Sequence, residues 1–275
     1  HLARPARQRR LSTGVEGLDD LLQGGLLTGS STVVAGPPGI GKTTLGLHFI
    51  AEGAHRGEPG MVASFAEAPE QLMVRANAFG LDLARHVDNG TVRMLWHPTT
   101  EFPIDAWATA LLATISAHHP RRVMIDGLTA LARLSSVVDR LPGFVAALGA
   151  TMRAEGIATV ISAETPTVEA AELDIPLPEA VATLDNVLLL RYVEPRSRLH
   201  RLISVLRVRE SGFDPHVREF TVTDRGIEVE PSSASAARVL EDIGRLRATP
   251  PTMSSSDLGE AGSRKSERTD DPGSR

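Results

Sequence analysis

Short apolar runs alternate with longer segments of helical periodicity over the first two thirds of the chain. Apolar runs rich in β-branched residues predict buried strands at residues 31–36, 60–65, 91–96, 121–126 and 157–164. Between the strands, apolar residues recur at three- and four-residue spacing, which predicts helices at residues 43–57, 68–80, 103–118 and 140–156. Strands that alternate with helices in this way predict an α/β fold, with a mostly parallel, doubly wound sheet flanked by helices.

The pattern changes after residue 185, where strand-like runs follow one another without helices. These runs cover residues 185–193, 198–209, 217–224 and 226–231, and they predict an antiparallel extension at one edge of the sheet. After Pro231, apolar residues at helical spacing predict a short helix at residues 233–248. That helix would either dock on the domain or a partner, or stay solvated.

The chain is long enough, at 275 residues, for one sizeable α/β domain. We expect the domain at residues 11–231, preceded by a basic arm at residues 1–10 and followed by the short helix within residues 232–248. The last segment, residues 249–275, is rich in Ser, Gly, Pro and mixed charges, which predicts a disordered tail.

Composition narrows the class of protein. The net charge of −5 provides no global attraction to nucleic acid or to anionic membranes. The absence of cysteine excludes disulfides, thiolate zinc sites and a cysteine nucleophile. The longest apolar run, residues 106–117, is shorter than the ~18 residues of a membrane span. Because the basic N-terminal segment also lacks the apolar stretch of a secretory signal, we expect a cytoplasmic protein that does not enter a membrane.

A glycine-rich loop follows the first predicted strand and opens the first predicted helix. In AGPPGIGKTTL, residues 35–45, Gly36 is followed after four residues by Gly41, Lys42 and Thr43. This spacing is the Walker A pattern: backbone N–H groups cradle phosphates, the lysine reaches the terminal phosphates and the hydroxyl binds Mg²⁺. Lys42 is the only lysine in the segment expected to fold, since the other lysine is Lys265. The predicted nucleotide-binding residues are Gly36, Gly39, Ile40, Gly41, Lys42, Thr43 and Thr44.

Asp126 ends the apolar run RRVMID and is the expected second anchor for Mg²⁺. P-loop enzymes hold this ion with the loop hydroxyl and a carboxylate on a buried strand. Open α/β sheets also bind their ligands at the carboxyl ends of the strands. An aspartate in this position often serves only as a helix cap, but after a Walker A loop in an alternating α/β chain the metal role is favoured. We therefore predict Thr43 and Asp126 as the metal ligands.

Several segments, in one order, resemble the KaiC-type ATPases of the RecA/RadA superfamily. They are RLSTGVEGLDDLLQGGLLTGSSTVVAGPPGIGKTTLGLHFI, ASFAEAPEQLMVRANAFGLDL, RRVMIDGLTAL, DNVLLLRYVE, VLRVRESGFDP and VREFTVTDRGIEV, and they fall within residues 10–231. The resemblance implies a RecA-like core, ATP and Mg²⁺ bound between the subunits of a ring, usually a hexamer, and slow hydrolysis in a regulatory role. The regulatory protein partner that this role implies is not identified by the sequence.

The chain departs from the family pattern at three places, two of which concern catalysis and self-phosphorylation. The family has two adjacent glutamates after the second strand, one of which orients or deprotonates the attacking water, whereas this chain has Ala66 and Glu67. Glu67 is then either the remaining catalytic base or only a favourable carboxylate at a helix start. Family members that phosphorylate themselves carry a Ser-Thr pair where this chain has Val181 and Ala182, so that reaction is not expected here.

A basic strand near the C-terminal end of the domain is expected to reach a neighbouring subunit. Family members often read Lys-x-Arg-Gly-Ser-x-His there. In RVRESGF this chain keeps the cations as Arg207 and Arg209, but it lacks the glycine and the histidine, which is the third departure. Side chains two residues apart on a strand share a face, so both guanidiniums would point from a predicted edge strand towards the neighbour's γ-phosphate. In that role they would act with Lys42 and Glu67. The alternative is a pair of arginines that face solvent.

Three functions are compatible with these residues. The first is a slow ATPase that assembles as a homo-oligomeric ring, and the second, favoured by Ala66, is an ATP-gated scaffold or signalling module with little hydrolysis. A DNA recombinase ranks third, because the loop at residues 164–180, which carries DNA contacts in recombinases, holds five acidic residues and neither a basic nor an aromatic one. We therefore expect the chain itself as a partner, and no nucleic acid.

Overall fold

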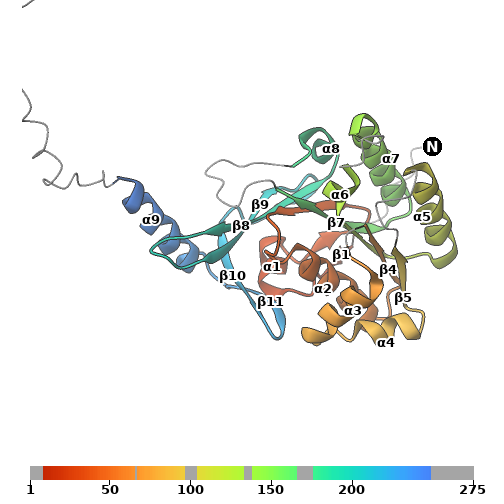
Figure 1. Cartoon of the computed structure of the whole chain (residues 1–275), viewed down its shortest axis with the longest axis horizontal. Coiled ribbons are helices and arrows are strands. Elements are labelled where there is room, and N and C mark those ends of the chain that lie inside the picture. Colours follow the sequence, from red (N-terminus) through yellow and green to blue (C-terminus); the bar gives the residue numbers. More distant parts are fainter. Residues whose placement is uncertain (1–8, 66, 97–103, 133–137, 166–175, 249–275) are drawn as a thin grey trace, which may run out of the picture.

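A nine-stranded sheet runs through the centre of the molecule (Figure 1). The computed structural model describes residues 9–65, 67–96, 104–132, 138–165 and 176–248. The strands of the sheet are β3 (Ser31–Gly36), β4 (Gly60–Ser64), β5 (Val92–Trp96), β6 (Arg122–Asp126), β7 (Ala158–Glu164), β8 (Asn186–Val193), β9 (His200–Arg207), β10 (Arg218–Thr223) and β11 (Gly226–Val229).

The order of the strands places β3, which leads into the glycine loop, in the middle of the sheet. Across the sheet the order is β11-β10-β9-β8-β3-β7-β6-β4-β5. The strands from β8 to β5 in this order lie parallel, and β9, β10 and β11 add antiparallel hairpins at the other side. This arrangement is a RecA-like α/β core with an antiparallel extension, as predicted. A separate short ladder joins β1 (Arg10–Leu11) to β2 (Leu26–Leu27).

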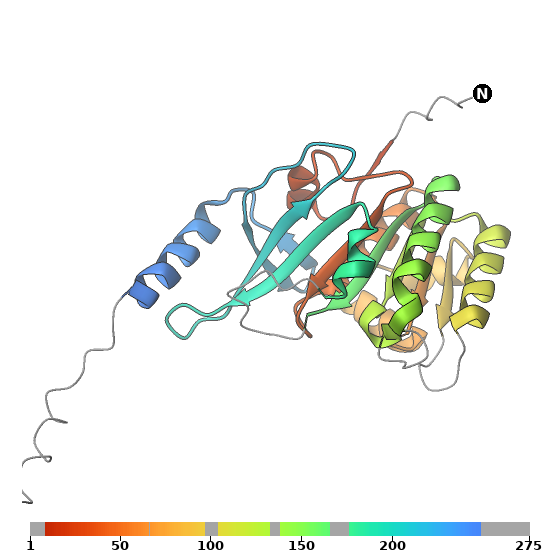
Figure 2. The ribbon, with the colours of Figure 1, turned by 90° about the horizontal axis from the view of Figure 1, so that it is seen from above.

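Helices cover both faces of the sheet (Figure 1). One face carries α1 (Glu16–Leu21), α2 (Lys42–His55), α3 (Pro69–Ala78) and α4 (Leu83–Asp88). The other face carries α5 (Ile104–His118), α6 (Leu128–Ala132), α7 (Leu141–Ala154) and α8 (Pro178–Ala182), and a 3₁₀ turn at Val138–Arg140 precedes α7. The last helix, α9 (Ala234–Ala248), extends beyond the sheet, as Figure 2 shows.

Two hydrophobic cores form because consecutive strand residues point to opposite faces. Val34 and Val62 pack into the core under α2, whereas Val33 and Met61 pack into the core under α5 and α7. All four side chains are fully buried. Strands buried on both faces are apolar throughout, which is why the pattern of the sequence showed continuous runs rather than alternation.

Every strand and helix that the pattern predicts is found in the structure, and its described ends lie within two residues of the expected ones. The pattern missed the short helices α1, α4, α6 and α8, which have five or six residues each and are too short to display a period. The helix predicted at residues 233–248 docks on the domain, where it buries Ala236 and Val239. The tail predicted at residues 249–275 lies outside the described residues.

Three expectations about particular strands and residues are wrong. β8 was grouped with the antiparallel extension, but it pairs parallel to β3, because the connection through α8 returns the chain to the end at which β3 starts. β9 was expected at the edge, but it lies between β8 and β10 because two more strands are added outside it. Arg10 was expected in the basic arm, but it belongs to the folded domain: its guanidinium donates to the carbonyls of Leu22 at 2.6 Å and Gly25 at 2.9 Å.

No helix in the described ranges combines the length and apolar character that a membrane crossing requires.

Candidate nucleotide-binding site

The glycine loop between β3 and α2 adopts backbone conformations that favour glycine. Gly39 has a φ of 75° and Gly41 a φ of 123°, which are strained for residues with a side chain. Gly36 is required for a different reason, since a Cβ atom there would lie 2.6 Å from the Leu190 carbonyl oxygen. The loop ends at Lys42, the first residue of α2, so the free N–H groups and the dipole of this helix favour an anion at the loop.

Lys42 is buried inside the loop. Its ammonium donates a hydrogen bond to the carbonyl of Pro37 at 2.8 Å. Burial lowers the pKa of Lys42, and the negative charges of Glu164 and Asp126 act in the opposite direction. The loop therefore holds a desolvated cation at a helix N-terminus, which is a suitable environment for the phosphates of a nucleotide.

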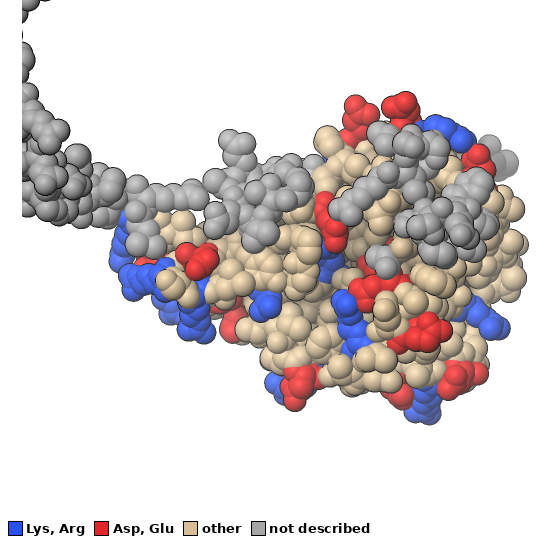
Figure 3. Space-filling view, viewed as in Figure 1, with Lys and Arg blue, Asp and Glu red and all other residues tan. Residues whose placement is uncertain are grey.

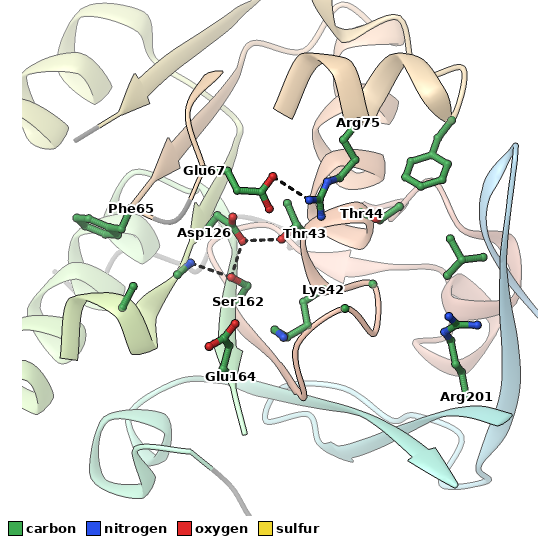
Figure 4. A pocket seen from close by; sticks show the side chains of 16 residues that line it. Lys42, Thr43, Thr44, Phe65, Glu67, Arg75, Asp126, Ser162, Glu164 and Arg201 are labelled. Carbon is green, nitrogen blue, oxygen red and sulfur yellow. Dashed lines mark hydrogen bonds and ion pairs between the residues drawn. The ribbon is translucent and has the colours of Figure 1, made fainter. Parts of the chain in front are cut away.

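Asp126, at the carboxyl end of β6, accepts hydrogen bonds from a hydroxyl at the start of α2 and from another on β7 (Figure 4). Its Oδ1 atom accepts hydrogen bonds from Thr43 Oγ1 at 3.0 Å and from Ser162 Oγ at 2.6 Å. The Ser162 hydroxyl in turn accepts from the Gly127 backbone N–H at 2.8 Å. Asp126 Oδ2 is buried and has no hydrogen-bond partner among the described residues. Burial raises the pKa of Asp126, and the hydrogen bonds from Ser162 and Thr43 oppose that rise.

A divalent cation fits this corner of the site. The buried oxygen of Asp126 without a partner lies on a carboxylate that also contacts the Thr43 hydroxyl, and hard oxygen donors of this kind are what Mg²⁺ prefers. Among the described residues, no group of three or more His, Asp or Glu side chains could hold a metal ion. A cation at Thr43 and Asp126 would therefore take its other ligands from phosphate oxygens and water, as Mg²⁺ does in nucleotide sites.

Glu67 follows β4 and points into the same site. Its backbone N–H donates to Ser64 Oγ at 3.0 Å, and its Oε2 atom accepts from the Arg75 guanidinium at 2.8 Å. Helix α3 begins at Pro69, two residues after Glu67, and the Glu67 carboxylate pairs with Arg75 of this helix. Burial raises the pKa of Glu67; Arg75 opposes this rise and Asp126 adds to it. Ala66 lies outside the described residues.

One pocket of about 560 Å³ contains these groups, a size typical of small-molecule sites at roughly 300–1,000 Å³. Figure 4 shows Glu67, Asp126 and Thr43 close together at one end, with Lys42 and Glu164 next to them and Arg201 across the cavity. Of the predicted site residues, those that line the pocket are Gly39, Gly41, Lys42, Thr43, Thr44, Glu67 and Asp126. Gly36 and Ile40 belong to the loop but do not line the pocket.

Sequence reasoning missed several residues that line the pocket. They are Phe65, Arg75, Phe79, Gly127, Ala130, Ser162, Glu164, Arg201 and Val222. Ser162 and Glu164 could have been found, because they end a predicted parallel strand and Glu164 is the register partner of Gly36. Arg201 and Val222 carry no such signal, since they come from antiparallel strands whose position beside the loop depends on the order of the sheet.

Arg207 and Arg209 do not line this pocket. Both guanidiniums point towards the end of α8, where Arg207 donates to the carbonyls of Val181 and Leu184, each at 2.8 Å. Arg209 donates to the Ala182 carbonyl at 2.6 Å. The two side chains therefore reach the same helix, although β9 ends at Arg207 and Arg209 lies just beyond it.

A glycine loop at a helix N-terminus, a buried lysine and a Thr–Asp pair at the carboxyl ends of parallel strands define a P-loop nucleotide-binding protein. The family model described as "ATPase: KaiC" matches residues 11–234. The chain belongs to this family of RecA-like ATPases.

Curated relatives support the same family. The chain is 32% identical to the circadian clock oscillator protein KaiC of Synechococcus elongatus over 256 residues, which cover 86% of this chain and 48% of the relative. It is 28% identical to KaiC of Picosynechococcus sp., covering 87% of this chain and 46% of the relative, and 30% identical to KaiC of Nostoc sp., covering 82% and 45%. The chain thus spans about half the length of the relatives it matches.

Proposed function

We propose that the protein binds ATP with Mg²⁺ in this pocket and hydrolyses it slowly, as one subunit of a homo-oligomeric ring. The observation that carries the proposal is the corner formed by Lys42, Thr43 and Asp126, where a buried ammonium adjoins a buried carboxylate oxygen that lacks a partner. Family membership supports nucleotide binding and ATPase activity in general. ATP is the nucleotide that the family description favours.

Each residue at this corner has a part in the proposed reaction. The loop backbone and Lys42 hold the phosphates, while Thr43 and Asp126 hold Mg²⁺, which when bound neutralises charge on the β- and γ-phosphates. Glu67 is the only carboxylate of the usual glutamate pair, and it accepts or orients the proton of the attacking water. Arg207 and Arg209 would act on a neighbour's nucleotide, which is consistent with their lying outside the pocket of their own chain.

Replacing Lys42 tests the nucleotide site. Lys42→Ala should abolish ATP–Mg²⁺ binding in a titration with a fluorescent ATP analogue, because the folded part has no second lysine to take its place. Arg56→Ala is the matched control, since it removes an exposed cation at the far end of α2 and should leave affinity unchanged. Unchanged affinity in Lys42→Ala would contradict the P-loop assignment.

An ATP-gated scaffold with little hydrolysis is the second candidate. It is favoured by Ala66, which halves the glutamate pair, and by the raised pKa of Glu67, which makes this carboxylate harder to ionise. Steady-state release of phosphate separates the two candidates. Release by the unmodified protein above the Lys42→Ala baseline supports the ATPase, whereas tight ATP binding without release supports the scaffold.

We do not propose a nucleic-acid partner. On the face drawn in Figure 3, acidic and basic side chains are mixed, and basic ones gather at the end formed by α9 and the neighbouring hairpin. Two arginines in that region are paired with carboxylates of α9: Arg196 with Asp242 at 2.9 Å and Arg245 with Glu241 at 3.8 Å. These carboxylates offset part of the positive charge that binding to a phosphate backbone needs. Most of the acidic loop weighed in the sequence lies outside the described residues.

A further inference from the structure

Arg75 brings a cation into the proposed active site from a helix that is separate from the glycine loop. It lies in α3, and its guanidinium meets the Glu67 carboxylate at 2.8 Å on the wall of the nucleotide pocket (Figure 4). We propose that Arg75 is the positioning residue for Glu67: it holds the single remaining glutamate in place for the attacking water. This inference rests on the hydrolytic activity proposed above.

Glu67 is fixed at two points, and Arg75 supplies the second. The backbone is held through the hydrogen bond from the Glu67 N–H to Ser64 Oγ, at the end of β4. The carboxylate is held only through Arg75 among the described hydrogen bonds and ion pairs of this residue. A glutamate side chain has several rotatable bonds, so without the ion pair its carboxylate would sample other positions, and misplacement of a reacting group by about 1 Å can cost ~10²-fold in rate.

The surroundings of Glu67 make a cationic partner necessary. The carboxylate is partly removed from water and shares the pocket with Asp126, and both effects favour the neutral form, which cannot accept a proton. The charge of Arg75 acts against both effects, and it also acts on Asp126. Arg75 thus supports the ionised carboxylate that general-base catalysis needs.

A purely structural role for Arg75 is a weaker explanation. The Arg75 side chain is 38% exposed, and ion pairs this exposed stabilise proteins by only ~0–1 kcal/mol. Helix α3 is anchored instead by Leu72 and Ala76, which are fully buried in the core. Replacing Arg75 should therefore leave the fold intact.

A double-mutant cycle in the full chain tests the proposal. Arg75→Ala should lower ATP turnover by ~10-fold or more while ATP affinity and melting temperature stay close to those of the unmodified protein. In the Glu67→Gln background, Arg75→Ala should lower turnover no further, because Arg75 acts through Glu67. Arg75→Lys, which keeps a positive charge, should recover part of the lost turnover. Arg85→Ala, an exposed arginine on α4, is the matched control and should behave like the unmodified protein.

Each contrary outcome overturns the inference in a recognisable way. Unchanged turnover in Arg75→Ala would remove the positioning role alone. An equal loss in the Glu67→Gln background would mean that Arg75 contacts the nucleotide directly. A loss of melting temperature or of ATP affinity in parallel with turnover would make its role structural. If the unmodified protein binds ATP but releases no phosphate above the Lys42→Ala baseline, both this inference and hydrolysis fail, and the scaffold function remains.

Discussion

At the scale of single residues, the buried carboxylate of Asp126 suits a metal ligand, but its ionisation destabilises the folded protein. The carboxyl group is buried, and burial raises its pKa, so the folded protein holds this proton more tightly than the unfolded chain. Ionisation therefore costs stability as pH rises from the ordinary pKa of Asp towards the raised one. Below the ordinary value, both states are protonated and the cost disappears.

Asp126→Asn should accordingly stabilise the nucleotide-free protein at neutral pH. We expect a gain of about 1 kcal/mol in the free energy of unfolding, or roughly 2–4 °C in melting temperature. The gain should shrink as pH falls from the raised pKa towards the ordinary pKa of Asp and be absent below it, and Mg²⁺-dependent ATP binding should be lost. Thermal melts from acid to neutral pH measure the gain in stability. Asp105→Asn, at an exposed carboxylate, is the control. Destabilisation at neutral pH would mean that Lys42 compensates the buried charge in full.

A second prediction at the residue scale concerns Glu67. Glu67→Gln should leave ATP binding intact and cut turnover by ~10²-fold or more, the range for loss of a general base. Protonation of Glu67 removes the base, so turnover should fall as the pH is lowered. Because the pKa of Glu67 is raised, this fall should begin at a higher pH than it would for a glutamate of ordinary pKa. That acidic limb should be absent from the residual activity of Glu67→Gln. Ala66→Glu should raise the rate if the second glutamate matters.

At the scale of elements, α8 depends on side chains that come from the end of β9 and the segment just after it. The helix has five residues, too few to be stable alone, and the carbonyls at its end accept hydrogen bonds from Arg207 and Arg209. Cations at this end also suit the helix dipole. The same two arginines are proposed to act on a neighbouring nucleotide, so the position of α8 and the state of the interface should be linked.

Arg209→Ala should loosen α8. We expect hydrogen exchange of a peptide covering residues 178–184 to speed up by ~10-fold, which corresponds to about 1.4 kcal/mol for a lost hydrogen bond from a charged group. Arg225→Ala, which removes an exposed arginine beside Glu228, should leave this peptide unchanged. Equal exchange in both variants would show that the guanidinium contributes nothing to the helix.

At the scale of the whole molecule, we propose that the active site is completed by a neighbouring subunit. Lys42, Asp126 and Glu67 lie in one pocket, and Arg207 and Arg209 lie outside it. A site completed by a neighbour should make specific activity rise with protein concentration. Arginines supplied in this way are worth ~10³–10⁵ in rate for related phosphoryl-transfer enzymes.

Mixing two inactive chains tests the shared site. A Lys42→Ala chain mixed with an Arg207→Ala/Arg209→Ala chain should recover part of the turnover, because some interfaces then combine an intact half from each parent. Light scattering on the same mixtures establishes that the chains assemble together. Co-assembly without recovery would place both arginines outside the active site.

The sequence predicted the parts of the fold and the site that depend on near neighbours in the chain. The glycine spacing, Lys42 and Thr43 form a local motif at the start of α2, and the apolar run before Asp126 indicated a buried strand with its carboxylate at the end. Long periodic segments were predicted to within two residues for the same reason. The parallel α/β class followed from the order of strands and helices alone.

Only the tertiary structure decided which distant residues meet the loop. Arg75 pairs with Glu67 because α3 packs back along the sheet, and Ser162 reaches Asp126 because β7 lies beside β6. Arg201 and Val222 face the loop because the antiparallel strands are added on the side of β8. Such contacts depend on the order of the strands and on the packing of many apolar side chains in the core. Neither is encoded in a periodic pattern or a motif of fixed spacing. The motif is local chemistry, whereas the wall of the pocket is a consequence of packing.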